Sequence, residues 1–248
     1  TDAIASQHKV KRISHPYPMG NGAAIKAGVR AASGKILVLM DADGQHQSSD
    51  IPNLLSRLAD GYDMAVGARS RGSQAGMHRA LANDVFSRFA SWMVSQRIQD
   101  LTSGFRAVRA DKFKKFLYLL PNGFSYPTTI TMSFFRAGFS VAYVPIDAPR
   151  RSGRSHIHPL RDGMRFLLII IKIGTLYSPQ KLFLPISAGF FSIGFTYYIY
   201  TYLVMGRFTN MSALMFISSI LTFLIGIVSE QISALHYKDT DQANPEDK

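Results

Sequence analysis

The first part of the chain alternates between short apolar runs and segments with helical spacing. The apolar runs predict strands at 9–13, 35–40, 62–67 and 139–144. Between and after them, apolar residues recur three and four positions apart, which predicts helices at 23–32, 51–59, 79–97, 111–120 and 127–137. Residues 100–109 are expected to be irregular. Strands that alternate with helices at this spacing favour βαβ units, so the pattern predicts an α/β fold with a mostly parallel sheet.

The pattern changes near the C-terminus, where two long runs contain no Asp, Glu, Lys or Arg. They cover 182–206 and 208–229. Each is long enough to cross a hydrocarbon core of about 30 Å as a helix. Only Arg207 separates the two runs, so we expect an antiparallel pair of transmembrane helices. The alternative, a core helix of a soluble protein, seldom remains uncharged over such a length.

An amphipathic segment at 161–177 precedes these runs. Its charged residues fall on one side of a helix, and the rest is apolar, including the run 166–171. This pattern favours an interfacial helix in the plane of the lipid headgroups, with a core helix of the soluble domain as the alternative. The predicted organisation is a catalytic domain at 1–158, a juxtamembrane helix at 159–180, two transmembrane helices at 181–237 and a disordered tail at 238–248.

Charge and cysteine content narrow the class of protein. The formal net charge is +12, and the segment 136–181 holds eight Lys and Arg against two acids, immediately before the first apolar run. Juxtamembrane basic residues favour the cytoplasmic side and anionic lipids, so both termini are expected there. Nucleic-acid motifs are absent, which argues against DNA or RNA as a partner. The chain has no Cys, which excludes disulfides and thiolate chemistry.

Candidate chemistry lies in the run Leu39-Met-Asp-Ala-Asp-Gly-Gln-His46, directly after a predicted strand. In an extended segment the i, i+2 spacing turns Asp41 and Asp43 to one side, and Gln45 continues the same parity. Three oxygen donors suit Mg2+ or Mn2+ and leave room for substrate phosphates. The alternative is a solvated Asp-Gly turn.

Five motifs in a fixed order, together with the apolar hairpin, resemble one known family. They are Asn21-Gly-Ala-Ala, Asp41-Ala-Asp-Gly-Gln-His, Gly67-Ala-Arg69, Asp100-Leu-Thr-Ser-Gly-Phe-Arg106 and Arg150-Arg-Ser-Gly-Arg-Ser155. The set resembles the polyprenyl-phosphate glycosyltransferases of glycosyltransferase family 2, the dolichol-phosphate mannose synthase group and its bacterial relatives. That family begins with two further strands that hold the nucleotide base. Here the first residues resemble the end of the second motif, so we expect those strands to be absent from the sequence.

The resemblance implies a GT-A fold and an inverting, metal-dependent hexosyltransferase. Its donor would be a GDP- or UDP-linked sugar, its acceptor dolichyl or undecaprenyl phosphate, and its cofactor Mg2+ or Mn2+. The implied location is a membrane with the catalytic domain in the cytoplasm, in a bacterial inner membrane rather than the endoplasmic reticulum. The resemblance leaves open whether the protein forms a homo-oligomer.

The resemblance also implies residue roles. Metal binding would fall to Asp41, Asp43 and Gln45, and donor binding to Asp41, Asp43 and Arg69. Catalytic roles would fall to Asp100 and Asp43, and contacts with the acceptor phosphate to Arg69, Arg79, Arg150 and Ser155. Two alternatives remain at this point: Asp100 can instead fix its loop, and a surface arginine is usually solvated. A phosphate acceptor is already anionic near pH 7, so it needs no strong base.

Two other functions compete with lipid-linked sugar synthesis. A processive polysaccharide synthase of the same fold would carry a Gln-x-x-Arg-Trp run, which this sequence lacks, and would use more than two membrane spans. A catalytically inactive membrane scaffold would need no metal ligands. The intact Asp41, Asp43 and Gln45 set counts against the scaffold.

Overall fold

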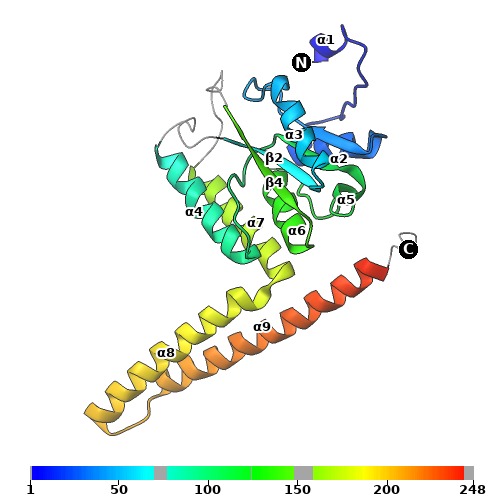
Figure 1. Cartoon of the computed structure of the whole chain (residues 1–248). Coiled ribbons are helices and arrows are strands. Elements are labelled where there is room, and N and C mark those ends of the chain that lie inside the picture. The colour runs from blue at the N-terminus through cyan, green and yellow to red at the C-terminus, as the bar shows by residue number, and fades with distance from the viewer. Residues whose placement is uncertain (1, 70–76, 124, 148–158, 243–248) are drawn as a thin grey trace. The chain divides into compact units, whose positions relative to one another are not determined.

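The computed structural model describes residues 2–69, 77–123, 125–147 and 159–242. The chain divides into two compact units, Thr1–Ile170 and Ile171–Lys248, which are considered separately below (Figure 1).

A four-stranded sheet organises the first unit. Its strands are β1 (Ile36–Leu39), β2 (Met64–Arg69), β3 (Arg106–Arg109) and β4 (Val141–Ile146), in the spatial order β1-β3-β2-β4. The β2 and β4 strands are parallel, whereas β3 runs antiparallel to both β1 and β2. The sheet is therefore mixed, and the expectation of a mostly parallel sheet is corrected. The difference arises because 100–109, expected to be irregular, supplies the reversed strand β3.

The helices of this unit largely follow the sequence pattern. They are α1 (Asp2–Ala5), α2 (Asn21–Ala31), α3 (Ile51–Ala59) after the short 3-10 turn η1 (Ser48–Asp50), α4 (Met77–Val94), α5 (Ala110–Lys114) and α6 (Tyr126–Arg136). The α3 bounds match the prediction, while α5 is shorter than predicted. Residues 9–13 form no strand, which corrects the first predicted element. Val10 and Ile13 are exposed there, and an isolated strand without a paired neighbour is not stable.

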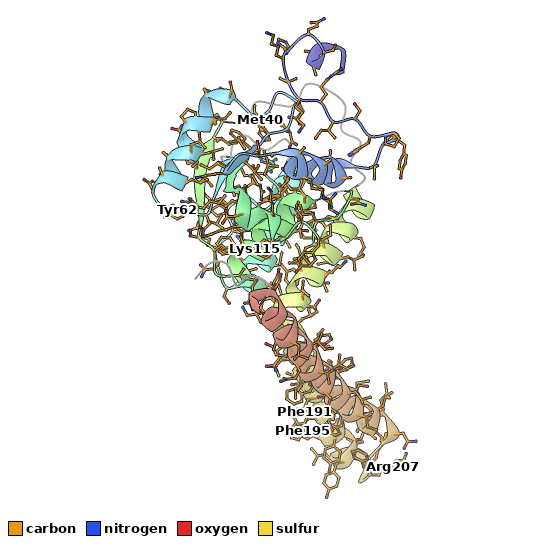
Figure 2. The ribbon with its side chains drawn as sticks, turned by 90° about the vertical axis from the view of Figure 1, so that its right-hand side faces the viewer. Met40, Tyr62, Lys115, Phe191, Phe195 and Arg207 are labelled. Carbon is orange, nitrogen blue, oxygen red and sulfur yellow. The ribbon has the colours of Figure 1, made fainter. Side chains whose placement is uncertain are left out.

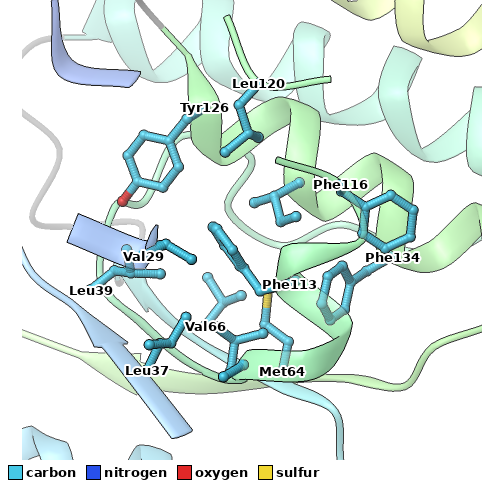
Figure 3. Packing of buried hydrophobic residues seen from close by; sticks show 13 residues of the cluster. Val29, Leu37, Leu39, Met64, Val66, Phe113, Phe116, Leu120, Tyr126 and Phe134 are labelled. Carbon is cyan, nitrogen blue, oxygen red and sulfur yellow. The ribbon is translucent and has the colours of Figure 1, made fainter. Parts of the chain in front are cut away.

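Helices cover both faces of the sheet because side chains alternate along each strand. One face carries the larger cluster, in which Leu37 and Met64 pack with the aromatic rings of Phe113 and Phe134 (Figure 3). On the other face, Leu54 and Leu58 of α3 pack against the sheet residues Ala65, Phe105, Ala107, Val144 and Ile146. The sheet is thus held between two apolar layers.

Helix α7 (Pro159–Tyr177) spans the boundary between the units. Within the first unit, Phe166 and Ile170 are buried, and the Phe166 ring lies 5.0 Å from that of Phe86 on α4. Met164 and Leu168 of the same helix are exposed. One face of this segment therefore packs as a core helix would. The face that carries Met164 and Leu168 is exposed.

The second unit contains the helical hairpin α8 (Pro179–Met205) and α9 (Asn210–Gln242), both with a segment long and apolar enough to cross a membrane. Ser187 and Ser219 join the helices, since each hydroxyl donates to the other residue's carbonyl oxygen at 2.9 Å. Large apolar side chains, Phe191 and Phe195 among them, cover the outside of the hairpin (Figure 2). The predicted pair of apolar helices is confirmed.

The C-terminal tail differs from its prediction. Helix α9 continues through Gln242, so residues 238–242 are helical rather than disordered. Extending an existing helix adds a backbone hydrogen bond for each residue that is fixed, which outweighs the polar composition here. Residues 243–248 lie outside the described chain.

Candidate functional site

The candidate site lies at one edge of the sheet, where three strands bring their polar ends together. Asp41 follows the end of β1, and Arg69 is the last residue of β2. Because β3 is antiparallel to both, its first residue, Arg106, pairs with Leu39 and Val66 near those ends. The loop that begins at Asp100 therefore reaches the same edge. A purely parallel sheet would carry this loop to the opposite edge.

The loop after β1 is closed by two hydrogen bonds from its own backbone. The Asp41 N–H donates to Nδ1 of His46 at 3.1 Å, and the Gln45 N–H donates to Oδ1 of Asp43 at 3.2 Å. Gly44 occupies the turn with φ of 80°, a conformation that glycine adopts without strain. Asp41, Asp43 and Gln45 remain partly exposed. The loop thus presents all three predicted donors from one short ordered turn.

The Asp41 carboxylate lies against the backbone of Gly104. A β-carbon at position 104 would be 2.5 Å from Oδ2 of Asp41 and 3.3 Å from the hydroxyl oxygen of Tyr126. That hydroxyl donates to the Gly104 carbonyl oxygen at 2.9 Å. Burial raises the pKa of Tyr126 to about 12, so the phenol keeps its proton and acts as the donor. Only glycine leaves room for the carboxylate at this position.

Asp100 and Arg69 form a buried ion pair beside this loop. Arg69 donates from Nε to Oδ2 of Asp100 at 2.8 Å and from Nη2 to Oδ1 at 2.9 Å. Backbone N–H groups of Arg69, Thr102 and Ser103 donate to the same carboxylate. Burial opposes ionisation of Asp100, but the Arg69 contacts and these N–H groups outweigh it and lower its pKa. The carboxylate is therefore ionised, enclosed and occupied by donors.

The acids of the loop also act on Arg69. Burial alone would lower its pKa, but Asp100, and then the charges of Asp41 and Asp43, raise it. Arg69 therefore lies close enough to Asp41, Asp43 and Asp100 to interact with them electrostatically, so the structure brings these four predicted residues together. Arg79 lies on α4, and its side chain is outside the description. Arg150 and Ser155 lie outside the described residues.

Two residues of this site had no role predicted from the sequence. His46 stacks on Phe105, with ring centroids 5.0 Å apart and an interplanar angle of 16°. Burial lowers the pKa of His46, against the opposing charges of Asp41 and Asp43, so the neutral imidazole is favoured. The feature of the sequence that could have pointed to His46 is its position directly after the Asp-x-Asp-x-Gln run.

The second is Arg106, which is fully buried. It donates to the Ser103 and Pro127 carbonyl oxygens and to the Thr131 hydroxyl, and its guanidinium lies 5.6 Å from the Tyr126 ring centroid. Arg106 therefore fastens the loop before β3 to the first turns of α6. An arginine within a strand interrupts the apolar pattern, which is why β3 escaped prediction.

The side chains of the loop after β1 include few of the groups that usually bind a divalent ion. Among the residues that the structure describes, no group of three His, Cys, Asp or Glu side chains could hold a metal. Two partly exposed carboxylates and an amide remain, from Asp41, Asp43 and Gln45. Mg2+ is commonly bound by one or two carboxylates together with substrate phosphates and water. The set therefore fits an ion whose coordination a bound diphosphate completes.

Comparison with known proteins agrees with this architecture. Two curated relatives are a dolichyl-phosphate hexose transferase of Haloferax volcanii, 28% identical over 65% of this chain and 71% of the relative, and a polyprenol monophosphomannose synthase of Mycolicibacterium smegmatis, 29% identical over 60% of each. A solved structure of glucosyl-3-phosphoglycerate synthase from Mycobacterium tuberculosis, with Mn2+, UDP and glucosyl-3-phosphoglycerate, has a TM-score of 0.51 and 19% identity. That match covers 69% of this chain and 62% of the neighbour, and it shows a shared fold.

Family models cover both units. Residues 1–117 match glycosyl transferase family 2, and residues 178–235 match the GtrB C-terminal hairpin. Strands β1, β2 and β3 and the polar edge that they form lie within the first match, and most of the α8–α9 hairpin lies within the second. The chain is therefore a glycosyltransferase with a family 2 domain at residues 1–117 and a GtrB-type C-terminal hairpin at residues 178–235.

Proposed function

We propose that this glycosyltransferase moves a hexose from a nucleotide sugar to a polyprenyl phosphate, with inversion at the sugar carbon. The carrying observation is the loop Asp41–His46, which presents two carboxylates and an amide beside the Arg69–Asp100 pair. The apolar hairpin supports a membrane acceptor, and the two curated relatives are named for dolichyl and polyprenol phosphate chemistry. The donor is GDP- or UDP-linked.

Asp41, Asp43 and Gln45 would hold Mg2+ or Mn2+. When bound, such an ion offsets the charge that develops on the nucleoside diphosphate leaving group. The Mn2+ and UDP in the solved neighbour support this cofactor class. The chain's own part is to keep the two carboxylates on one side of a closed turn, so that they need little reorganisation when the donor binds.

Asp100 is proposed as a positioning residue rather than as a general base. Its side chain is 1% exposed, and its two oxygens accept from Arg69, Thr102 and Ser103. A low pKa makes it a weak base, and an anionic phosphate acceptor has no need of one. Among the alternatives that the sequence left open, this geometry favours the one in which Asp100 fixes its loop. Asp43 keeps its proposed roles in metal binding, donor binding and catalysis.

The acceptor phosphate is assigned to arginines, because a planar guanidinium matches phosphate oxygens well. Arg79, Arg150 and Ser155 are proposed contacts. Arg69 contributes positive charge near the nucleotide-sugar donor, while its guanidinium is held by two hydrogen bonds to Asp100. In this arrangement the catalytic unit lies in the cytoplasm, at a bacterial inner membrane, and reaches an acceptor whose chain stays in the bilayer.

A transfer assay tests the function. The purified protein is incubated with labelled GDP- or UDP-sugars and polyprenyl phosphate, and the label is followed into organic solvent. Label in the organic phase that requires Mg2+ or Mn2+ and disappears with EDTA supports the proposal. A water-soluble polymer would indicate a processive synthase, and no turnover with any donor would indicate a scaffold.

Matched variants sharpen this test. Asp43→Asn removes one proposed ligand charge and should lose most of the turnover. Asp60→Asn removes an exposed acid that pairs with Arg57 away from the site, and should keep it. Equal activity of the two variants in the presence of metal would contradict the ligand assignment.

A further inference from the structure

The imidazole of His46 is folded back onto its own loop rather than turned toward solvent. Its Nδ1 accepts the Asp41 N–H at 3.1 Å, which closes a loop of six residues onto its first member. A backbone N–H can only donate, so Nδ1 must carry the lone pair and the ring proton resides on Nε2. This contact fixes the direction of the Asp41 backbone, and with it the direction of the Asp41 side chain.

The ring itself is fixed from the other side. His46 stacks on Phe105, which is fully buried in the cluster between α3 and the sheet. Phe105 packs closely on Gly67, where a β-carbon would come within 2.9 Å of its ring. The chain of contacts therefore runs from the sheet core through Phe105 and His46 to the Asp41 backbone.

At the end of this chain of contacts, the Asp41 carboxylate packs closely against Gly104. Oδ2 lies over Gly104, 2.5 Å from the position that a β-carbon there would occupy. Reaching this seat requires the Asp41 backbone to keep the orientation that the hydrogen bond to His46 sets. His46 thus holds the Asp41 backbone through a hydrogen bond, and the Asp41 carboxylate packs on Gly104.

We propose that His46 is a positioning residue that orients Asp41 for divalent metal binding through its Nδ1 acceptor. This inference rests on the proposed function, in which Asp41 is a metal ligand. His46 acts on Asp41 and does not itself bind the ion, because its Nδ1 is occupied by a backbone N–H. Among the described residues it also joins no group of three acidic, His or Cys side chains that could hold a metal.

Two substitutions separate the acceptor atom from the aromatic ring. His46→Asn places an amide oxygen near the position of Nδ1 and removes the stacking on Phe105. His46→Phe keeps a ring that stacks on Phe105 and removes the acceptor. If His46→Phe does not fold, His46→Leu serves the same comparison, because it also lacks an acceptor. Thermal unfolding of each variant in detergent reports whether the fold is kept.

Mn2+ binding is the direct readout, measured by electron paramagnetic resonance of the free ion during titration of the whole chain, with and without UDP. Removing a group that orients a metal ligand typically weakens metal affinity by about 10- to 100-fold, and this is the loss expected for His46→Phe. His46→Asn should recover most of it. In the transfer assay, the His46→Phe defect should appear as a raised Mn2+ requirement, with an unchanged KM for polyprenyl phosphate.

The outcomes separate this inference from the function on which it rests. Wild-type affinity in a folded His46→Phe variant overturns the inference, while loss of Mn2+ binding in Asp43→Asn still upholds the metal site. Equal losses in the Phe and Asn variants also overturn it, because an acceptor atom at this position would then fail to restore Mn2+ binding. If the wild type and Asp43→Asn bind Mn2+ equally or not at all, the proposed metal site fails and the inference fails with it.

Discussion

Arg69 and Asp100 are joined by two parallel hydrogen bonds, Nε to Oδ2 at 2.8 Å and Nη2 to Oδ1 at 2.9 Å. The pair links the last residue of β2 to the start of the loop that precedes β3. Asp100 is 1% exposed and Arg69 is 25% exposed at the side chain. Two segments that the sequence separates by thirty-one positions are thereby held as one rigid edge of the site.

Breaking this pair from one side should destabilise the protein strongly. Arg69→Met leaves the Asp100 carboxylate buried without its cation, which typically costs about 3–5 kcal/mol. The double variant Arg69→Met/Asp100→Asn should be more stable than Arg69→Met alone, because the orphaned charge is removed. Denaturant unfolding followed by the fluorescence of Trp92, the only tryptophan, measures both. As a control, Arg57→Met disrupts an exposed pair, where about 0–1 kcal/mol is expected. A similarly small effect for Arg69→Met would contradict the geometry.

Gly104→Ala should damage metal binding more than stability. The new β-carbon would lie 2.5 Å from Oδ2 of Asp41, so the carboxylate must leave its seat. We expect Mn2+ affinity to fall about 10- to 100-fold, as for other changes that displace a metal ligand. Gly28→Ala is the matched control, because no atom lies within 4 Å of its added β-carbon. Unchanged Mn2+ affinity in Gly104→Ala would show that Asp41 is not a ligand.

Acid should weaken the fold through Asp63, at the opposite end of β2. Burial opposes its ionisation, but Lys112 at 2.5 Å and the Ser140 N–H and hydroxyl outweigh this and lower the pKa of Asp63. A depressed carboxyl pKa adds stability above the unfolded value of about 3.9, and this is lost as pH falls through the folded value.

The Asp63→Asn variant tests this linkage. Its deficit in unfolding free energy relative to wild type should be largest near neutral pH and should shrink below about pH 4, where the wild-type carboxylate takes up its proton. Urea unfolding at a series of pH values measures the difference. A deficit that stays constant from neutral to acid pH would argue that the ionised form has no special stabilisation.

The hairpin should place its connecting turn across the membrane from the catalytic unit. The chain contains no cysteine, so single cysteines can be introduced without background. Arg207→Cys, in the exposed turn between α8 and α9, should react with an impermeant maleimide from outside spheroplasts. Asp60→Cys, exposed in the catalytic unit, should react only after lysis. The reverse pattern would place the catalytic unit outside.

Acceptor recognition is tested at Arg150. Loss of one charge-assisted contact with a phosphate costs about 1.5–3 kcal/mol, which corresponds to about a ten- to hundredfold loss of affinity. We therefore expect Arg150→Ala to raise the KM for polyprenyl phosphate by about that factor, with donor KM nearly unchanged. A raised donor KM with an unchanged acceptor KM would assign this arginine to the diphosphate.

The local elements and the candidate ligands in the loop after β1 could be predicted from residues that are close together in the sequence. The amphipathic spacing of 51–59 predicts a helix with the bounds that α3 shows, and the two uncharged runs predict the α8–α9 hairpin. Asp41, Asp43 and Gln45 could be predicted as candidate metal ligands because all three lie within a single short turn. These features depend on neighbours close in sequence, where periodicity and residue type carry the information.

The assembly of the site depends on tertiary packing, which the sequence pattern does not reveal. The reversal of β3, which brings Asp100 to Arg69, depends on pairing with strands far away in the sequence, and its own pattern is masked by the buried Arg106. The seat of Asp41 on Gly104 is likewise a contact between distant segments. Local periodicity reports which face of an element is apolar. It does not report which strand becomes its neighbour or in which direction that neighbour runs, because packing across the whole sheet selects the pairing.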